Sequence, residues 1–132
     1  MSDNNNFLFD IKVGDIDLYG HMSHVAYFYY LEEASVKFFR LHSISLMPSG
    51  LTPVVASVDC KYIRSINYPN TILIDTIATK ISPKKLQLTC KIQSADSTIT
   101  YAISNKTFVW FDFKSQAAID LPDMVLNQLG LA

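Results

Sequence analysis

The sequence is short of charge and of cysteine, and each shortage excludes a class of protein. Only 17% of the 132 residues are charged, and 11 Lys and Arg nearly balance 12 Asp and Glu. No global field therefore draws the chain to nucleic acid or to an anionic membrane surface. The two cysteines, Cys60 and Cys90, have no C-x-x-C or other metal-ligand spacing. We expect both to be reduced core residues of a cytoplasmic protein.

Long apolar runs are also missing. No stretch of about 18 uncharged apolar residues occurs, and residues 1–6 are polar and lack the basic-then-apolar order of a signal peptide. We therefore expect no membrane insertion, and flexibility in residues 1–6. The length fits one domain, residues 1–132, with a single core. Apolar residues, by contrast, make up 49% of the chain, so we expect part of that surface to contact another subunit.

Hydropathy changes its period twice along the chain. Apolar residues alternate over 7–13, which predicts a strand, and then recur at three- and four-residue steps over 25–41, which predicts a long helix. Alternation returns over 54–64, 72–81, 86–93 and 99–113, and a short helix is expected over 122–129. One strand, one long apolar helix and four consecutive strands predict an α+β fold, an antiparallel sheet wrapped around a central helix.

Two of these strands carry more detailed expectations. In residues 54–62 the apolar side chains of Val54, Ala56 and Val58 are expected on one face, together with Cys60 and Tyr62. In residues 99–113 the pattern blurs around Phe108–Phe111. Either both faces of that strand are covered, or a bulge shifts its register.

Reactive side chains are concentrated in the loop before the long helix. Residues 14–24 contain Asp15, Asp17, His21 and His24. This places carboxylates and imidazoles near the unpaired N–H groups at the start of a helix. Such donors can polarise a carbonyl oxygen.

The string Gly14-Asp15-x-Asp17-x-x-Gly20, followed by Tyr27, Glu32 and Ala34, resembles a known family. It is similar to the hotdog thioesterases of the 4-hydroxybenzoyl-coenzyme A type, including the tol-pal-associated acyl-CoA thioesterases. The resemblance implies a hotdog fold and hydrolysis of an acyl-CoA thioester to free acid and CoA. It implies no metal or redox cofactor, since coenzyme A is part of the substrate.

The same resemblance implies roles for particular residues. Asp17 matches the catalytic carboxylate, which acts as nucleophile or as general base on water. A backbone N–H near His24 would hold the thioester oxygen, and the His24 side chain matches a histidine that assists the carboxylate in the tol-pal-associated branch. Gly20 and Tyr27 are expected to contact the substrate. Ala26 departs from the pattern, because the family usually has asparagine there.

Each of these residues also has a plainer interpretation. Asp17 could cap a turn, as Asp15 is expected to do. His21 and His24 suggest a metal pair, but no third ligand follows at a recognised spacing, so no metal site is predicted. Glu32 could be a second site carboxylate or an anchor for the preceding loop.

Three basic residues, Arg64, Lys84 and Lys85, fall at predicted strand ends and turns. We assign them to the phosphates of coenzyme A, although such residues also serve simply to keep turns soluble.

The sequence leaves two other functions open, and it also suggests an oligomeric state. A hotdog enoyl-CoA hydratase would place aspartate and histidine five apart with a proline between, whereas Asp15 and His21 are six apart and the proline is missing. A non-catalytic module that binds acyl groups or another protein is the third hypothesis. We expect a homodimer joined edge to edge through its sheets, or a homotetramer of two such dimers.

Overall fold

The structure is a computed structural model that describes residues 5–46 and 50–132. Residues 1–4, part of the segment expected to be flexible, lie outside the described residues. The elements in chain order are β1 (Asn6–Asp10), a 3-10 turn η1 (Val13–Asp15), α1 (His24–Leu41), β2 (Leu51–Tyr62), β3 (Thr71–Ser82), β4 (Lys85–Ser94), β5 (Thr100–Asp112), β6 (Ala117–Ile119) and α2 (Asp123–Gln128).

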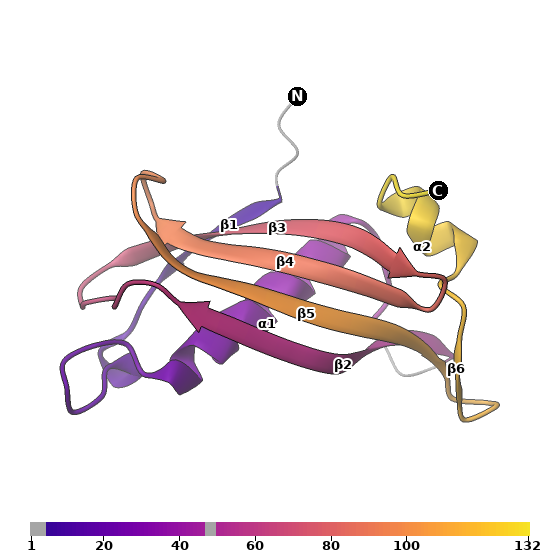
Figure 1. Cartoon of the computed structure of the whole chain (residues 1–132), viewed down its shortest axis with the longest axis horizontal. Coiled ribbons are helices and arrows are strands. Elements are labelled where there is room, and N and C mark those ends of the chain that lie inside the picture. Colours follow the sequence, from indigo (N-terminus) through magenta and orange to yellow (C-terminus); the bar gives the residue numbers. More distant parts are fainter. Residues whose placement is uncertain (1–4, 47–49) are drawn as a thin grey trace.

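All strand pairs are antiparallel, and the strands follow the order β1-β3-β4-β5-β2, with the short β6 paired to β5. Helix α1 crosses one face of this curved sheet, and α2 lies at the end of the molecule opposite the loop that precedes α1 (Figure 1). The expected α+β fold, an antiparallel sheet around a long helix, is confirmed.

Helix α1 forms where the sequence predicts it, because its start signal and its apolar period agree. Ser23 is the N-cap, and its hydroxyl accepts a 3.3 Å hydrogen bond from the Val25 N–H. Tyr27, Leu31 and Ala34 recur at helical spacing, and all are buried against the sheet. Ala34 has no exposed surface, so its small side chain lets the helix axis approach the strands closely.

Strand β2 contains a bulge that the sequence did not reveal. Val55 pairs with Phe108 and Ser57 pairs with Thr107, so Ala56 is an extra residue with no partner on β5. Because a bulge reverses the alternation on one side of it, Val54 lies on the outer face, whereas Val58 lies on the face that carries the helix. The expectation that Val54, Ala56 and Val58 share a face was therefore wrong.

Strand β5 resolves the two alternatives left for residues 99–113. Its helix-facing residues are all buried: Ala102, Ser104, Lys106, Phe108 and Trp110. The outward residues between them are half-buried. The alternation through Phe108–Phe111 is regular, so the blurred pattern reflects two partly covered faces. One member of the buried row, Lys106, is charged, and its burial was not expected from the sequence.

Candidate active site

The loop before α1 is fixed by Asp15. Its carboxylate accepts a 2.8 Å hydrogen bond from the Lys12 N–H and a second hydrogen bond from the hydroxyl of Tyr30, which lies in the second turn of α1. Its carbonyl accepts the Ser23 N–H at 2.8 Å. Asp15 thus joins both ends of the loop to α1, which agrees with the structural role expected for it.

Asp17 lies at the tip of this loop. Its N–H donates to the His21 carbonyl at 2.9 Å, and its carbonyl accepts the Gly20 N–H at 3.1 Å. Gly20 has φ +85°, a conformation that favours glycine. The Asp17 carboxylate accepts a hydrogen bond through Oδ1 only, at 2.9 Å from the Tyr19 N–H, as far as residues 5–46 and 50–132 show. Oδ2 is therefore available to a ligand.

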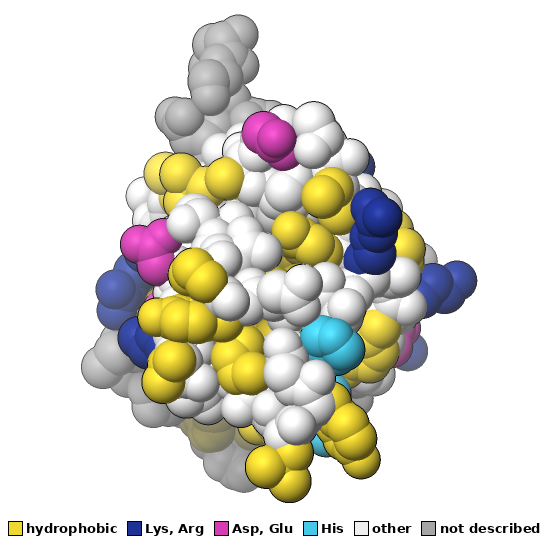
Figure 2. All heavy atoms as spheres, turned by 90° about the vertical axis from the view of Figure 1, so that its left-hand side faces the viewer, with side chains coloured by type: hydrophobic (Ala, Val, Ile, Leu, Met, Phe, Trp, Pro, Cys, Tyr) yellow, Lys and Arg dark blue, Asp and Glu magenta, His cyan; other side chains and the backbone are white. Residues whose placement is uncertain are grey.

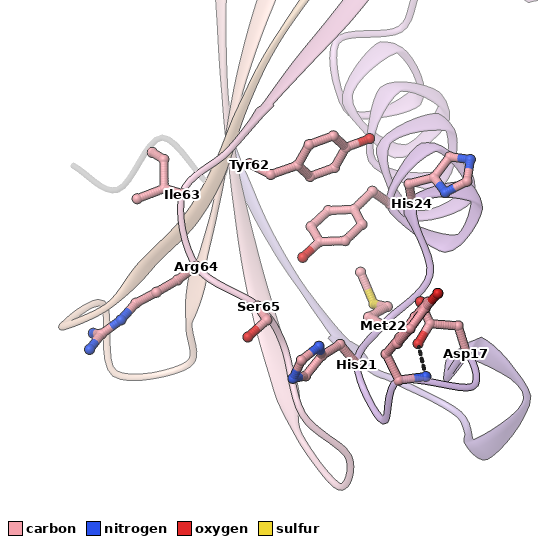
Figure 3. Close-up of a pocket in the computed structure, with 10 residues that line it drawn as sticks. Asp17, His21, Met22, His24, Tyr62, Ile63, Arg64 and Ser65 are labelled. Carbon is pink, nitrogen blue, oxygen red and sulfur yellow. Dashed lines mark hydrogen bonds between the residues drawn. The ribbon is translucent and has the colours of Figure 1, made fainter.

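A pocket of about 520 Å³ lies beside Asp17. Three segments line it: the loop, the first turns of α1, and the end of β2 with the residues after it (Figure 3). The lining residues are Asp17, Tyr19, His21, Met22, His24, Tyr27, Tyr62, Ile63, Arg64 and Ser65. The structure thus brings together four residues that the sequence singled out, Asp17, His24, Tyr27 and Arg64. Gly20 shapes the loop but does not line the pocket.

Helix α1 begins at this pocket, which His24 lines. The N–H groups of Val25 and Ala26 bond to the side chain and carbonyl of Ser23, at 3.3 and 2.9 Å. The His24 N–H has no acceptor among the described residues. A helix N-terminus carries partial positive charge, so this N–H is suited to an oxygen that gains negative charge.

Two tyrosines form the apolar wall of the pocket. The rings of Tyr27 and Tyr62 meet edge to face, with centroids 4.8 Å apart. Tyr27 is buried, and this desolvation raises the pKa of its phenol to about 12. Its hydroxyl therefore stays protonated at neutral pH and is available as a hydrogen-bond donor.

The two histidines line the pocket but do not meet Asp17. Both rings are exposed, and within the described part of the chain neither makes a hydrogen bond to the Asp17 carboxylate. In Figure 3 the His21 ring points away from Asp17, and the His24 ring lies at the start of α1. The residues that the structure describes also contain no group of three His, Cys, Asp or Glu side chains positioned to hold a metal ion.

Lys84 and Lys85 lie far from this pocket in the same chain. Tyr62, at the pocket, pairs with Ala102 on β5, whereas Lys85 pairs with Val109. Seven residues of strand separate these positions, a distance of about 23 Å. Lys84 instead forms an ion pair with Asp120 at 3.1 Å.

Sequence reasoning missed the contribution of residues 62–65. They comprise the last residue of β2 and the three that follow it, and they reach the loop because the Met22 N–H donates to the Ile66 carbonyl at 2.8 Å. Nothing in their pattern indicates that contact, although Arg64 was singled out for its charge. Glu32 was also misplaced, since it contacts Lys106 on β5 rather than the loop.

Comparison with known proteins identifies the family. The family model described as the thioesterase-like superfamily matches residues 11–129, nearly the whole chain. The chain belongs to the thioesterase-like superfamily. This membership supports hydrolysis of thioesters as the general activity and confirms the expected hotdog thioesterase family. Among curated proteins, none matches the chain significantly.

Solved structures of this superfamily share the fold. The PA2801 protein of Pseudomonas aeruginosa, described only as a candidate thioesterase, is 26% identical, with a TM-score of 0.84 over 92% of this chain and 95% of that one. Slr0204 of Synechocystis, a 1,4-dihydroxy-2-naphthoyl-CoA thioesterase, is 13% identical, with a TM-score of 0.85 over 95% and 94% of the two chains. BH1999, a gentisyl-coenzyme A thioesterase, is 18% identical, with a TM-score of 0.82 over 96% and 99%.

Within residues 5–46 and 50–132, no helix combines the length and the apolar character needed to span a membrane.

Proposed function

We propose that this superfamily member is an acyl-CoA thioesterase that uses Asp17. The observation that carries the proposal is that Asp17 and His24 line one pocket, while the Asp17 Oδ2 and the His24 N–H have no partner among the described residues. A carboxylate and an oxyanion donor on one cavity are the two groups that thioester hydrolysis requires.

The reaction balances by either of two routes. As general base, Asp17 takes a proton from water while the water oxygen attacks the thioester carbon. As nucleophile, its carboxylate oxygen attacks the carbon directly, and water then hydrolyses the resulting anhydride. In both routes the C–S bond breaks and the thiolate of coenzyme A takes up a proton. The His24 N–H stabilises the negative charge on the carbonyl oxygen in each route.

Three further residues suit an acyl-CoA. The Tyr27–Tyr62 wall presents ring surface to the acyl group, and relatives of this fold have 1,4-dihydroxy-2-naphthoyl-CoA and gentisyl-coenzyme A as their named substrates. Arg64 lines the pocket with an exposed side chain, so we assign it alone to a coenzyme A phosphate. Lys84 and Lys85 lie about 23 Å away along the sheet of the same chain, so we do not assign them to the pocket of their own chain.

We further propose that the enzyme is a homodimer joined through β2. Among the described residues this edge strand has no partner on its outer side, and the helix-facing side chains of Val55, Val58 and Tyr62 are 44%, 40% and 48% exposed. An unpaired edge with exposed apolar side chains favours pairing with a second strand. A second copy of β2 in antiparallel orientation would extend the sheet and cover these residues.

The test is release of free thiol from a panel of short, long and aromatic acyl-CoAs. Asp17→Asn is compared with the wild type and with Asp123→Asn, an exposed aspartate of α2 that serves as a matched control. We expect Asp17→Asn to lower kcat/KM at least about 100-fold with an unchanged melting temperature, and the control to retain activity.

Two outcomes would contradict the proposal. If Asp17→Asn keeps its activity, Asp17 is not the catalytic carboxylate. If the wild type binds acyl-CoAs but hydrolyses none of them, the chain is a non-catalytic acyl-binding module.

A further inference from the structure

Lys106 is a charged residue in the buried row of β5. Its side chain is 6% exposed, and it lies on the helix-facing side of the strand, beneath the middle of α1. Its Nζ donates to the Ser35 hydroxyl at 3.1 Å and to the Glu32 carboxylate at 3.2 Å, and it lies 5.7 Å from the centre of the Phe108 ring.

The contacts of Lys106 with Glu32 and Ser35 contribute little to the stability of the fold. Burying a cation is costly unless it is well paired, yet the Glu32 side chain is 65% exposed. An ion pair with one partner in solvent contributes little. Ser35 does not need the lysine either, because its own hydroxyl donates to the Leu31 carbonyl at 2.9 Å. An apolar side chain at position 106 would suit folding better, so the charge points to a ligand.

A cavity lies beside the residues that contact Lys106. It has a volume of about 190 Å³ and lies between the second half of α1 and β2. Glu32, Ser35 and Phe108, the three groups that contact Nζ, all line it, and the remainder of its wall is apolar and includes Val36, Phe39 and Val55. The cavity thus has mostly apolar walls, and its two polar lining residues, Glu32 and Ser35, are the ones that bind the Lys106 ammonium.

We propose that Lys106 and Ser35 bind the far end of the acyl group, so that the enzyme selects acyl chains ending in a hydrogen-bond-accepting oxygen, a carboxylate above all. An ammonium has three N–H donors, and two are used by groups in the described residues. A ligand oxygen takes the third, or replaces Glu32, whose exposed side chain turns into solvent. This inference rests on the proposed acyl-CoA thioesterase and its dimer.

The strand register indicates which active site this cavity serves. If two β2 strands pair antiparallel over their full length, Tyr62 lies against Leu51 of the second copy, Cys60 against its Pro53, and Val58 against its Val55. Tyr62 borders the Asp17 pocket, whereas Pro53 and Val55 border the Lys106 cavity. In this arrangement the cavity of one copy lies next to the Asp17 pocket of the other.

The first experiment measures selectivity with chain-matched substrates: hexanoyl-CoA against 6-hydroxyhexanoyl-CoA and adipoyl-CoA, and decanoyl-CoA against sebacoyl-CoA. The wild type is expected to prefer an oxygen-ended chain at one of these lengths. Lys106→Met should lower kcat/KM for that substrate at least about tenfold and leave the methyl-ended partner within about twofold. Lys106→Arg should restore part of the preference, and Lys91→Met, on an exposed position of β4, should change neither.

The second experiment tests whether the two residues act across the interface. Asp17→Asn and Lys106→Met chains are co-expressed with different tags, and the mixed dimer is purified. If Lys106 serves the partner's Asp17, one site of this dimer carries both changes and the other carries none, so the active site keeps wild-type selectivity. If both residues serve the same site, the only active site carries Lys106→Met and its selectivity is lost.

Failure of this inference can be told apart from failure of the proposed function. Binding of non-hydrolysable thioether analogues of the same acyl-CoAs is measured by calorimetry in Asp17→Asn, with and without Lys106→Met, so no turnover is needed. A preference for oxygen-ended analogues that Lys106→Met removes supports the inference even if no substrate is hydrolysed. Equal binding and turnover of methyl- and oxygen-ended chains by the wild type, or a preference that survives Lys106→Met, would overturn it. Ser35→Ala provides a second variant should Lys106→Met fail to fold.

Discussion

At Asp17, the turn-capping and catalytic roles that the sequence presents as rivals are compatible. Oδ1 accepts the Tyr19 N–H at 2.9 Å, and Oδ2 has no partner in the described part of the chain. The first contact fixes the carboxylate and the second oxygen stays reactive. A carboxylate held by one backbone hydrogen bond loses less freedom when substrate binds, which favours the reaction.

Tyr27 gives a prediction at high pH. Folding raises the pKa of its phenol from 10.0 to about 12, so folding favours the neutral form. The resulting stability is complete below pH 10 and is lost as the pH rises from 10 towards 12. We expect the free energy of unfolding to fall more steeply over this range in the wild type than in Tyr27→Phe, as measured by urea denaturation.

Burial also raises the pKa of Tyr30 and Tyr62. Both residues are present in the wild type and in Tyr27→Phe, so the difference between the two pH profiles reports on Tyr27 alone. Parallel pH profiles for the wild type and Tyr27→Phe would show that burial does not act on the Tyr27 phenol.

At the scale of elements, the loop and α1 depend on each other through Tyr30 and Asp15. Tyr30 is only 2% exposed, and its hydroxyl donates to the Asp15 carboxylate. Tyr30→Phe removes this hydrogen bond to a charged group, and we expect it to lower the stability by about 1–3 kcal/mol. Because the loop carries Asp17, kcat should fall more than KM changes. Thermal unfolding and steady-state kinetics measure the two effects.

Tyr29→Phe is the matched control for this prediction, since Tyr29 is the neighbouring residue of α1 and is 51% exposed. If the two variants behave alike in both measurements, the Tyr30–Asp15 contact does not position the loop.

The bounds of α1 follow from the local sequence pattern, whereas those of the strands do not. Residues 25–41 were expected to be helical and α1 spans His24–Leu41, because helix formation depends on neighbours three and four residues away. The bulge at Ala56 was not visible, because it depends on which β5 residue each β2 residue faces. In the same way the strand expected over residues 7–13 ends at Asp10, where β3 ceases to offer a partner at Thr71.

For the whole molecule, the β2 edge predicts an assembly that a single charge disrupts. Val58 is 40% exposed near the middle of the helix-facing side of β2. Val58→Lys would bury an unpaired ammonium from each copy at the interface, at a cost of several kcal/mol per charge. We expect a dimer for the wild type and a monomer of reduced activity for Val58→Lys by sedimentation velocity.

Ile77→Lys is the control, because Ile77 is 63% exposed on β3, away from the β2 edge. A wild-type monomer, or a Val58→Lys protein that stays dimeric, would contradict pairing through β2.

The sequence by itself determined the order of the elements, the long helix, the α+β class and the loop that carries Asp17, because these features depend on residues close together in the chain. Only the tertiary structure decided that residues 62–65 meet that loop, that Lys106 lies beside Ser35 under α1, and that Lys84 and Lys85 lie at the far end of the sheet. These placements depend on strand register. The register pairs residues that are far apart in the sequence, such as Val58 and Lys106, and the single bulge at Ala56 shifts these pairs by one residue.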